Sequence, residues 1–210
     1  MVKPKGWILS WRGLIAFGLF AIAAWQIGGG LYIHAKAQLA QHLMAQAWAK
    51  TLDGSERVRP WAWADAWPVA RLQVPDLGID QFVLSNASNR TLAFGPGHLI
   101  GSAPPGVQGH VIIGGHRDTH FSFMADLEPD MAIRMQDSTG RWQSYLVRES
   151  QVIDSRRARI HSAGNRPSLS LITCYPFDAV QPGGPLRYIA WADGESLQEN
   201  QTAVVQTAPQ

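Results

Sequence analysis

A long, uncharged and mostly apolar run lies near the N-terminus, from Gly13 to Ile33. As a helix, this run of about 21 residues would be roughly 31 Å long, which matches the hydrocarbon thickness of a bilayer. More basic residues flank the run upstream than closely downstream, with Lys3, Lys5 and Arg12 before it and Lys36 after it. The positive-inside rule then predicts a transmembrane signal anchor over 13–33, with residues 1–12 in the cytoplasm and the rest of the chain outside.

A cleaved signal peptide is the alternative interpretation of this run. Ala35-Lys36-Ala37 has the small-x-small form of a cleavage site. The run is longer than the apolar region of most signal peptides, which favours an uncleaved anchor. Under both interpretations the remainder of the chain leaves the cytoplasm.

Residues 34–66 are predicted to form a stalk helix and a linker. The stretch 35–50 is rich in helix-forming residues. Three apolar residues within it recur at a spacing of four, namely Leu39, Leu43 and Ala47. The helix is either a stalk that continues from the membrane or a terminal helix packed on the following domain, and the pattern fits both.

From Val69 onward the helical period disappears and short apolar runs replace it. Clusters of Gly, Pro, Asn and Asp separate the runs, which are Val69–Val74, Phe82–Leu84, His110–Ile113, Trp142–Val147, Leu169–Thr173 and Tyr188–Trp191. This pattern predicts an all-β domain, a compact barrel or sandwich, over residues 67–194. The polar, Gln-rich segment 195–210 is predicted to be disordered.

Charge and cysteine content limit the classes of partner and site that the chain can have. The formal net charge is +2 and the basic residues are scattered, so no nucleic-acid partner is expected. One cysteine cannot build an internal disulfide framework or a multi-cysteine metal site. A lone thiol is either a small buried hydrophobe or a reactive group. Outside the cytoplasm an unpaired thiol is open to oxidation, which makes this cysteine more notable.

Cys174 lies where a strand-like run ends and a turn begins. Ser168–Thr173 leads into it, and the turn-forming stretch Tyr175-Pro176-Phe177-Asp178 follows. A thiol at such a junction is presented rather than buried. As a nucleophile it requires an imidazole within reach, to accept or share its proton.

His116 has the same position in its own segment. It ends an apolar run that starts at His110, and the polar residues 117–120 follow. Asp118 either orients the imidazole of His116, as a carboxylate does in a catalytic triad, or caps a turn. His120 and His116 are a possible pair of metal ligands, although we expect no metal site.

Acyl transfer also requires a positive or hydrogen-bonding group for the developing oxyanion. Arg187 opens the last strand-like run and follows Cys174 by 13 residues. A strand, a loop and a neighbouring antiparallel strand over that distance would bring the two residues together. Arg187 is therefore a candidate oxyanion stabiliser, although an arginine at the start of a strand is also a common surface charge.

These motifs resemble those of sortases, a family of surface-protein transpeptidases. The resemblance rests on Gly115-His116, on Leu171-Ile172-Thr173-Cys174 and on Arg187, and covers roughly residues 67–193. The family signature around the cysteine is Thr-Leu-x-Thr-Cys, so Ser170 is a departure that leaves the chemistry untouched. Three wider stretches resemble the proteobacterial subgroup called class GN, namely 114–121, 173–179 and 182–188.

The resemblance implies a closed sortase-type β-barrel of about eight strands, preceded by the transmembrane helix and the short helical stalk. It implies cleavage of a Leu-Pro-x-Thr-Gly (LPXTG) type C-terminal sorting signal between Thr and Gly, through a thioester that an amine resolves. Cys174 is then the nucleophile, His116 the general acid/base and Arg187 the group that steadies the oxyanion. Asp118 and Thr173 are supporting residues, and no cofactor or metal is required.

The subgroup resemblance also implies a location and partners. It places the chain in the inner membrane of a Gram-negative cell as a single-pass protein, with the catalytic domain in the periplasm. The partners would be a protein that carries the sorting signal and an amine acceptor. Residues 155–168, which carry four arginines, correspond to the loop that shapes signal recognition in sortases.

Four alternative functions differ in what they require of the sequence. A papain-like protease is disfavoured by the lone, strand-borne cysteine, and an L,D-transpeptidase by the lack of a Ser-His-Gly-Cys-type motif. Two further alternatives are a membrane-tethered, non-catalytic β-domain that scaffolds an envelope protein and an envelope cysteine hydrolase. The scaffold requires an inert Cys174, whereas the hydrolase shares the acyl-enzyme with the transpeptidase.

Overall fold

The computed structural model describes residues 11–157, 166–179, 181 and 183–194. The helices are α1 (Trp11–Leu52) and α2 (Asn89–Leu92), with short 3-10 turns η1 (Pro75–Leu77) and η2 (Ser122–Asp126). The strands are β1 (Pro68–Val74), β2 (Ile79–Leu84), β3 (Gly97–His98), β4 (His110–Gly114), β5 (Ala132–Gln136), β6 (Trp142–Asp154), β7 (Ser168–Cys174) and β8 (Leu186–Gly194). The predicted disordered tail, most of the predicted cytoplasmic segment and the centre of the expected recognition loop lie outside the described residues.

The chain divides into two compact units, Met1–Gln41 and His42–Gln210. In the first unit, α1 runs through the whole apolar segment, and its large apolar side chains are exposed, as at Phe17 and Trp25. In the part of the chain that the structure describes, α1 is the one helix long and apolar enough to cross a membrane. The expected N-terminal helix is therefore confirmed.

The last turns of α1 belong to the second unit, together with the barrel. Met44 is buried and packs with Leu84 of β2. Trp48 is also buried, its ring centroid lies 6.5 Å from that of Phe82, and its indole Nε1 donates a 3.3 Å hydrogen bond to Gln136 Oε1. Residues from 42 onward, expected within the stalk and linker, are thus part of the compact barrel unit.

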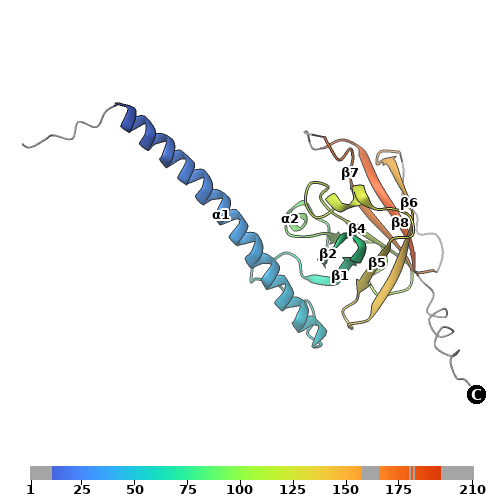
Figure 1. Ribbon diagram of the computed structural model, residues 1–210. Helices are drawn as coiled ribbons and strands as arrows, with labels where there is room; N and C mark the ends of the chain where they lie inside the picture. Colours follow the sequence, from blue (N-terminus) through green and yellow to red (C-terminus); the bar gives the residue numbers. More distant parts are fainter. Residues whose placement is uncertain (1–10, 158–165, 180, 182, 195–210) are drawn as a thin grey trace, which may run out of the picture. The chain divides into compact units, whose positions relative to one another are not determined.

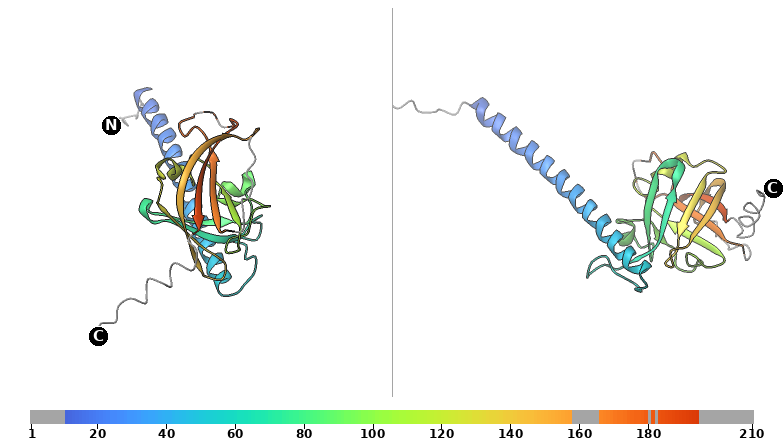
Figure 2. Two further views of the ribbon diagram at one scale, coloured as in Figure 1. Left: turned by 90° about the vertical axis from the view of Figure 1, so that its right-hand side faces the viewer. Right: turned by 60° about the horizontal axis from the view of Figure 1, so that its bottom comes forward.

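The strands close into a barrel with the order β1-β2-β3-β4-β7-β8-β6-β5, and β5 pairs with β1 to complete it (Figures 1 and 2). The pairs β2–β3 and β4–β7 are parallel, whereas the other pairs are antiparallel. The expected closed barrel of eight strands is confirmed. This strand order places β7 between β4 and β8, which matters for the site described below (Figure 1).

Alternation of side chains along the strands fills the barrel interior. In β1 every second residue is buried, from Pro68 to Val74. In β7, Leu169, Leu171 and Thr173 are buried, so Cys174 falls on the alternate face. Burial of these apolar side chains is the main stabilising contribution to the barrel.

Two whole strands, β3 and β5, and parts of others had no counterpart among the predicted runs. β5 buries only Ile133 and Met135, and its pairing with β1 and β6 decides its conformation. β3 has two residues, and a Cβ on Gly97 would lie 2.2 Å from the Asn86 carbonyl oxygen, so only glycine fits there. β6 extends beyond the predicted run to Asp154 because it pairs with β8 as far as Asp154 and Leu186.

Candidate active site

Cys174 is the last residue of β7, and its thiol is free and half-buried. It pairs directly with Arg187 in the antiparallel register of β7 and β8. Residues opposite each other in such a register have Cα atoms about 4.5–5.5 Å apart and side chains on the same face of the sheet. The 13-residue separation in sequence therefore closes into a direct cross-strand neighbour pair.

His116 follows the end of β4, on the other side of β7. The parallel register between these strands runs from His110 and Ser168 to Gly114 and Ile172. Continuing it by two residues would set His116 against Cys174. The imidazole is exposed, and the backbone carbonyl of His116 accepts hydrogen bonds from the amides of Thr119 (3.4 Å) and Phe121 (2.9 Å).

Two hydrogen bonds tie the end of β4 to the end of β7. The Gly115 amide donates to the Ile172 carbonyl at 3.1 Å, and the buried Thr173 hydroxyl donates to the Gly115 carbonyl at 2.8 Å. Beneath this contact lies the ring of Phe121, which would be 2.6 Å from a Cβ on Gly115. The turn that carries His116 is thus fixed by packing against Phe121 and by hydrogen bonds to β7.

Arg187 is half-buried, and its guanidinium bonds to its own loop. Its Nη1 donates to the carbonyl of Gly184 at 2.6 Å and to that of Leu186 at 2.8 Å. These bonds hold the cation near the start of β8, at the same barrel end as Cys174. A fixed guanidinium can stabilise developing negative charge without reorganising during reaction.

Asp118 is placed differently from a residue that orients His116. Its carboxylate accepts a 2.9 Å hydrogen bond from Arg117 Nε, and its side chain is 67% exposed. The structure therefore couples Asp118 to Arg117, and any influence of Asp118 on His116 would be indirect. This placement also differs from the alternative of a turn cap, since the hydrogen bond that the Asp118 carboxylate accepts comes from a side chain.

His120 lies close enough to His116 to be affected by its charge. Burial lowers the pKa of His120 most, and the positive field of a protonated His116 lowers it further, whereas a hydrogen bond with the Ala93 backbone acts in the opposite direction. His120 is thus biased towards the neutral imidazole. No cluster of three or more potential metal-ligating side chains occurs among the described residues.

Sequence reasoning missed two features beside Cys174. Arg117 is buried and bonds to the loop that follows the cysteine. Tyr175, Phe177 and Tyr188 form an aromatic cluster, in which Tyr188 stacks on Tyr175 at 6.2 Å and meets Phe177 edge-on at 5.1 Å. In the sequence, Arg117 is marked only by its position directly after His116. Its burial depends on the tertiary structure and could not be predicted.

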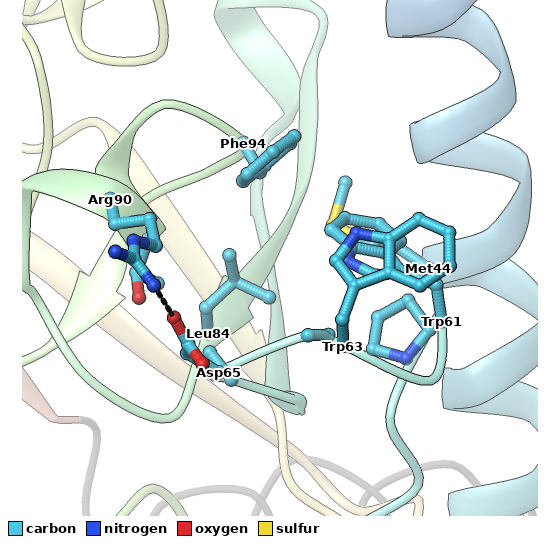
Figure 3. Close-up of a pocket in the computed structure, with 11 residues that line it drawn as sticks. Met44, Trp61, Trp63, Asp65, Leu84, Arg90 and Phe94 are labelled. Carbon is cyan, nitrogen blue, oxygen red and sulfur yellow. Dashed lines mark hydrogen bonds and ion pairs between the residues drawn. The ribbon is translucent and has the colours of Figure 1, made fainter.

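A separate pocket of about 190 Å³ lies where the end of α1, the linker and α2 meet (Figure 3). Its walls are mostly aromatic and aliphatic, with an ion pair of 2.7 Å between Arg90 and Asp65 at one side. Among the described residues that line it, none is Cys174, His116 or Arg187. The pocket is therefore distinct from the candidate active site.

The motifs and the barrel both have known relatives. Residues 72–195 match the protein family described as Sortase domain. Sortase D of Bacillus subtilis (strain 168) is 29% identical over 121 residues, which covers 57% of this chain and 60% of the relative. The match thus spans less than two thirds of that relative's length.

Solved structures with the same fold include two sortases. Sortase A from Corynebacterium diphtheriae has a TM-score of 0.58 and 26% identity, over 73% of this chain and 72% of that chain. Sortase C from Clostridium perfringens, solved with the C-terminal cell wall sorting motif, has a TM-score of 0.56 over 78% of this chain and 91% of that chain. At 14% identity the second likeness concerns the fold alone. Because the family match extends over more than half of its length, the chain belongs to the sortase family.

Proposed function

We propose that this chain is a membrane-anchored cysteine transpeptidase that cleaves an LPXTG-type sorting signal and transfers the acyl group to an amine. One observation carries the proposal. Cys174 lies at the end of the central strand β7, Arg187 is its cross-strand partner on β8, and His116 follows the end of β4 on the other side. A nucleophile, a base and a cation at one end of three adjacent strands form the minimal set for acyl transfer.

The first half-reaction forms a thioester. The Cys174 thiol gives its proton to His116, and the sulfur attacks the carbonyl carbon of the Thr–Gly bond in the signal. Arg187 stabilises the negative charge on the tetrahedral oxygen. The carbon–nitrogen bond then breaks while the His116 imidazolium donates its proton to the departing glycine amine.

The second half-reaction regenerates the enzyme. An acceptor amine attacks the thioester carbonyl and loses a proton to His116, after which the carbon–sulfur bond breaks and the Cys174 thiolate regains that proton. Water as the acceptor would give hydrolysis instead. The envelope hydrolase is therefore the same chemistry with a different acceptor, and the two are distinguished by their products.

Three further roles belong to the proposal. Thr173 is a supporting residue that keeps the ends of β4 and β7 together through its bond to Gly115. Asp118 is a supporting residue that acts through Arg117. The substrate class is supported by the C. perfringens sortase C, a protein of the same fold whose structure was solved with a C-terminal cell wall sorting motif.

The location and subgroup are proposed from the sequence. The apolar helix α1 and the upstream basic residues support a single-pass anchor with the barrel on the extracytoplasmic side. The motifs around His116, Cys174 and Arg187 support class GN, and with it the inner membrane and a periplasmic barrel. The named relatives are a sortase D, a sortase A and a sortase C, so the subgroup proposal rests on those motifs.

The test uses the full-length chain in detergent micelles with a labelled LPXTG-type peptide. Intact mass spectrometry should show a covalent adduct, with the mass of the acyl fragment, on the unmodified chain. Adding an amine should remove the adduct and yield a new amide. Cys174→Ala should form no adduct, whereas His42→Gln, a change on the exposed surface of α1, should behave as the unmodified chain.

Each alternative has its own outcome. Release of the free acid with and without an amine would identify a hydrolase. Failure of every peptide to form an adduct, with a thiol that resists alkylation until the chain unfolds, would refute the enzyme and leave the scaffold.

A further inference from the structure

Arg117 is a buried cation beside the candidate active site. Its side chain is 6% exposed, and among the described residues it is the only buried arginine or lysine. It directly follows His116 in the sequence. Removing a guanidinium from water is costly unless hydrogen bonds and charge compensate it, so its partners explain why the chain tolerates it there.

Those partners lie in the loop that follows Cys174. Nη1 donates to the Pro176 carbonyl at 2.5 Å, and Nη2 donates to the Ala179 carbonyl. Nε donates to Asp118, whose carboxylate is largely exposed and therefore contributes little to stability. The two carbonyl oxygens, rather than the ion pair, are the contacts made inside the protein.

The geometry requires arginine and not merely a positive charge. A planar guanidinium presents its two Nη groups in a fixed fork, so one side chain can fix two separated carbonyl oxygens at once. A lysine ammonium carries its three donors at a single nitrogen on a flexible stem, so it cannot reproduce the fork that spans the two carbonyl oxygens. Arg117 thus fixes the loop at two points, three residues apart.

A second attachment holds the same loop to β8. Tyr175 and Phe177 pack against Tyr188, which is the residue after Arg187. The Tyr175 amide also donates a 3.1 Å hydrogen bond to the Leu186 carbonyl. The loop is therefore tied to the His116 turn by Arg117 and to the Arg187 strand by aromatic packing.

We propose that Arg117 is a positioning residue, which fixes residues 175–179 against the His116 turn and thereby holds the Cys174 thiol in register with the imidazole. Its consequence for turnover rests on the proposed transpeptidase function. A purely structural arginine would stabilise the barrel without affecting the relation between Cys174 and His116. Positioning predicts a local loosening around Cys174 and a loss of kcat, because small misplacements of reacting groups cost up to about 100-fold in rate.

The experiment compares the full-length chain with Arg117→Lys and with a matched control, Arg141→Lys. Arg141 also bonds to a carboxylate, that of Asp137, but its side chain is 72% exposed and lies in the β5–β6 hairpin. Hydrogen exchange of the amides in 175–179 is measured first, since it requires no substrate. In Arg117→Lys these amides should exchange at least about 10-fold faster while those of β5 and β6 stay unchanged, and in Arg141→Lys the amides of 175–179 should not change.

Turnover is measured on the same samples. Arg117→Lys should lose roughly 10- to 100-fold in kcat with KM changed less than about 3-fold, because the binding surface is kept and the reacting geometry is not. If exchange in 175–179 is unchanged, or kcat stays within about 2-fold of the unmodified chain, the positioning role is refuted. If the unmodified chain turns over no peptide, the transpeptidase proposal fails, while the exchange result still decides whether Arg117 fixes the loop.

A measurement on the unmodified chain covers the case in which Arg117→Lys does not fold. Side-chain N–H protons of Arg117 should exchange slowly in NMR spectra, because three of its groups donate to protein oxygens. Arg90, whose side chain is 80% exposed, provides the comparison within the same spectrum. If the Arg117 protons exchange as fast as those of Arg90, the proposed hydrogen bonds from Arg117 to the loop after Cys174 are refuted.

Discussion

The hydroxyl of Thr173 donates a 2.8 Å hydrogen bond to the backbone carbonyl of Gly115, 58 residues away in the sequence. The bond joins the residue before Cys174 to the residue before His116. It is buried, so water cannot replace it when it is lost. The residues that precede the proposed nucleophile and base are therefore linked by a side chain-to-backbone hydrogen bond that involves neither the thiol nor the imidazole.

Thr173→Val should test this link, since valine keeps the shape and removes the hydroxyl. The carbonyl of Gly115 would lose its side-chain donor, which should cost about 1–2 kcal/mol of the free energy of unfolding. We expect acyl transfer to fall by about 10-fold, because the two strand ends are no longer held in register. Denaturant titration and steady-state kinetics measure the two effects, and Thr173→Ser, which keeps the hydroxyl, should recover most of the activity. Full activity in Thr173→Val would argue against the link.

Arg187→Gln should reduce kcat by about 100- to 1,000-fold with the barrel intact, because the cation opposite Cys174 is removed. Peptide-cleavage kinetics give the rate, and circular dichroism checks the fold. Arg148→Gln is the matched control, since Arg148 is an exposed arginine that pairs with Asp193 at 2.8 Å on the barrel surface. An equal loss in both variants would show that the effect of Arg187 is not local.

Gly115→Ala should destabilise the chain by about 1–3 kcal/mol, because the added methyl group would lie 2.6 Å from the Phe121 ring. Phe121→Leu makes space at the cost of packing. The double variant should therefore be more stable than the sum of the two single changes predicts, and a double-mutant cycle of unfolding free energies measures this coupling. Strict additivity would contradict the contact.

Trp48→Ala should cost about 3–5 kcal/mol of unfolding free energy, since it empties a buried site between the end of α1 and β2. Trp63→Ala is the matched control, because Trp63 is 81% exposed and its loss should change stability by less than about 0.5 kcal/mol. Thermal or chemical denaturation compares the two. Equal effects would mean that residues from 42 onward are not part of the folded barrel unit.

His110→Asn should weaken the pH dependence of stability on the acidic side of neutrality. Burial lowers the pKa of His110 below its usual value of about 6.5. The unfolded chain therefore binds a proton more readily than the folded chain, and the folded state loses stability as pH falls below about 6.5 until the lowered pKa is passed. Unfolding free energies at pH 7.5 and 5.5 should differ less in His110→Asn than in the unmodified chain. His42→Asn, at an exposed site, should leave the difference unchanged.

Sequence alone determined the features that depend on local pattern. The run from Gly13 to Ile33 predicted an apolar helix, and short apolar runs between turn residues predicted an all-β domain, a barrel or a sandwich. Reactive side chains at the ends of such runs made Cys174, His116 and Arg187 the candidate site residues, and the three motifs indicated the sortase family, which the family match confirms. Periodicity, length and motif order are properties of neighbouring residues, so no contact had to be known.

Tertiary structure decided everything that depends on which segments meet. β5 became a strand because β1 and β6 flank it, and residues 42–52 packed on the barrel because β2 leaves an apolar surface for Met44 and Trp48. The Asp118 carboxylate bonds to Arg117 because the buried guanidinium donates to it. The other contacts of Arg117 are with the loop after Cys174, which only the tertiary structure brings next to it. Burial and cross-strand register arise from contacts between residues far apart in the chain, and a local pattern does not contain them.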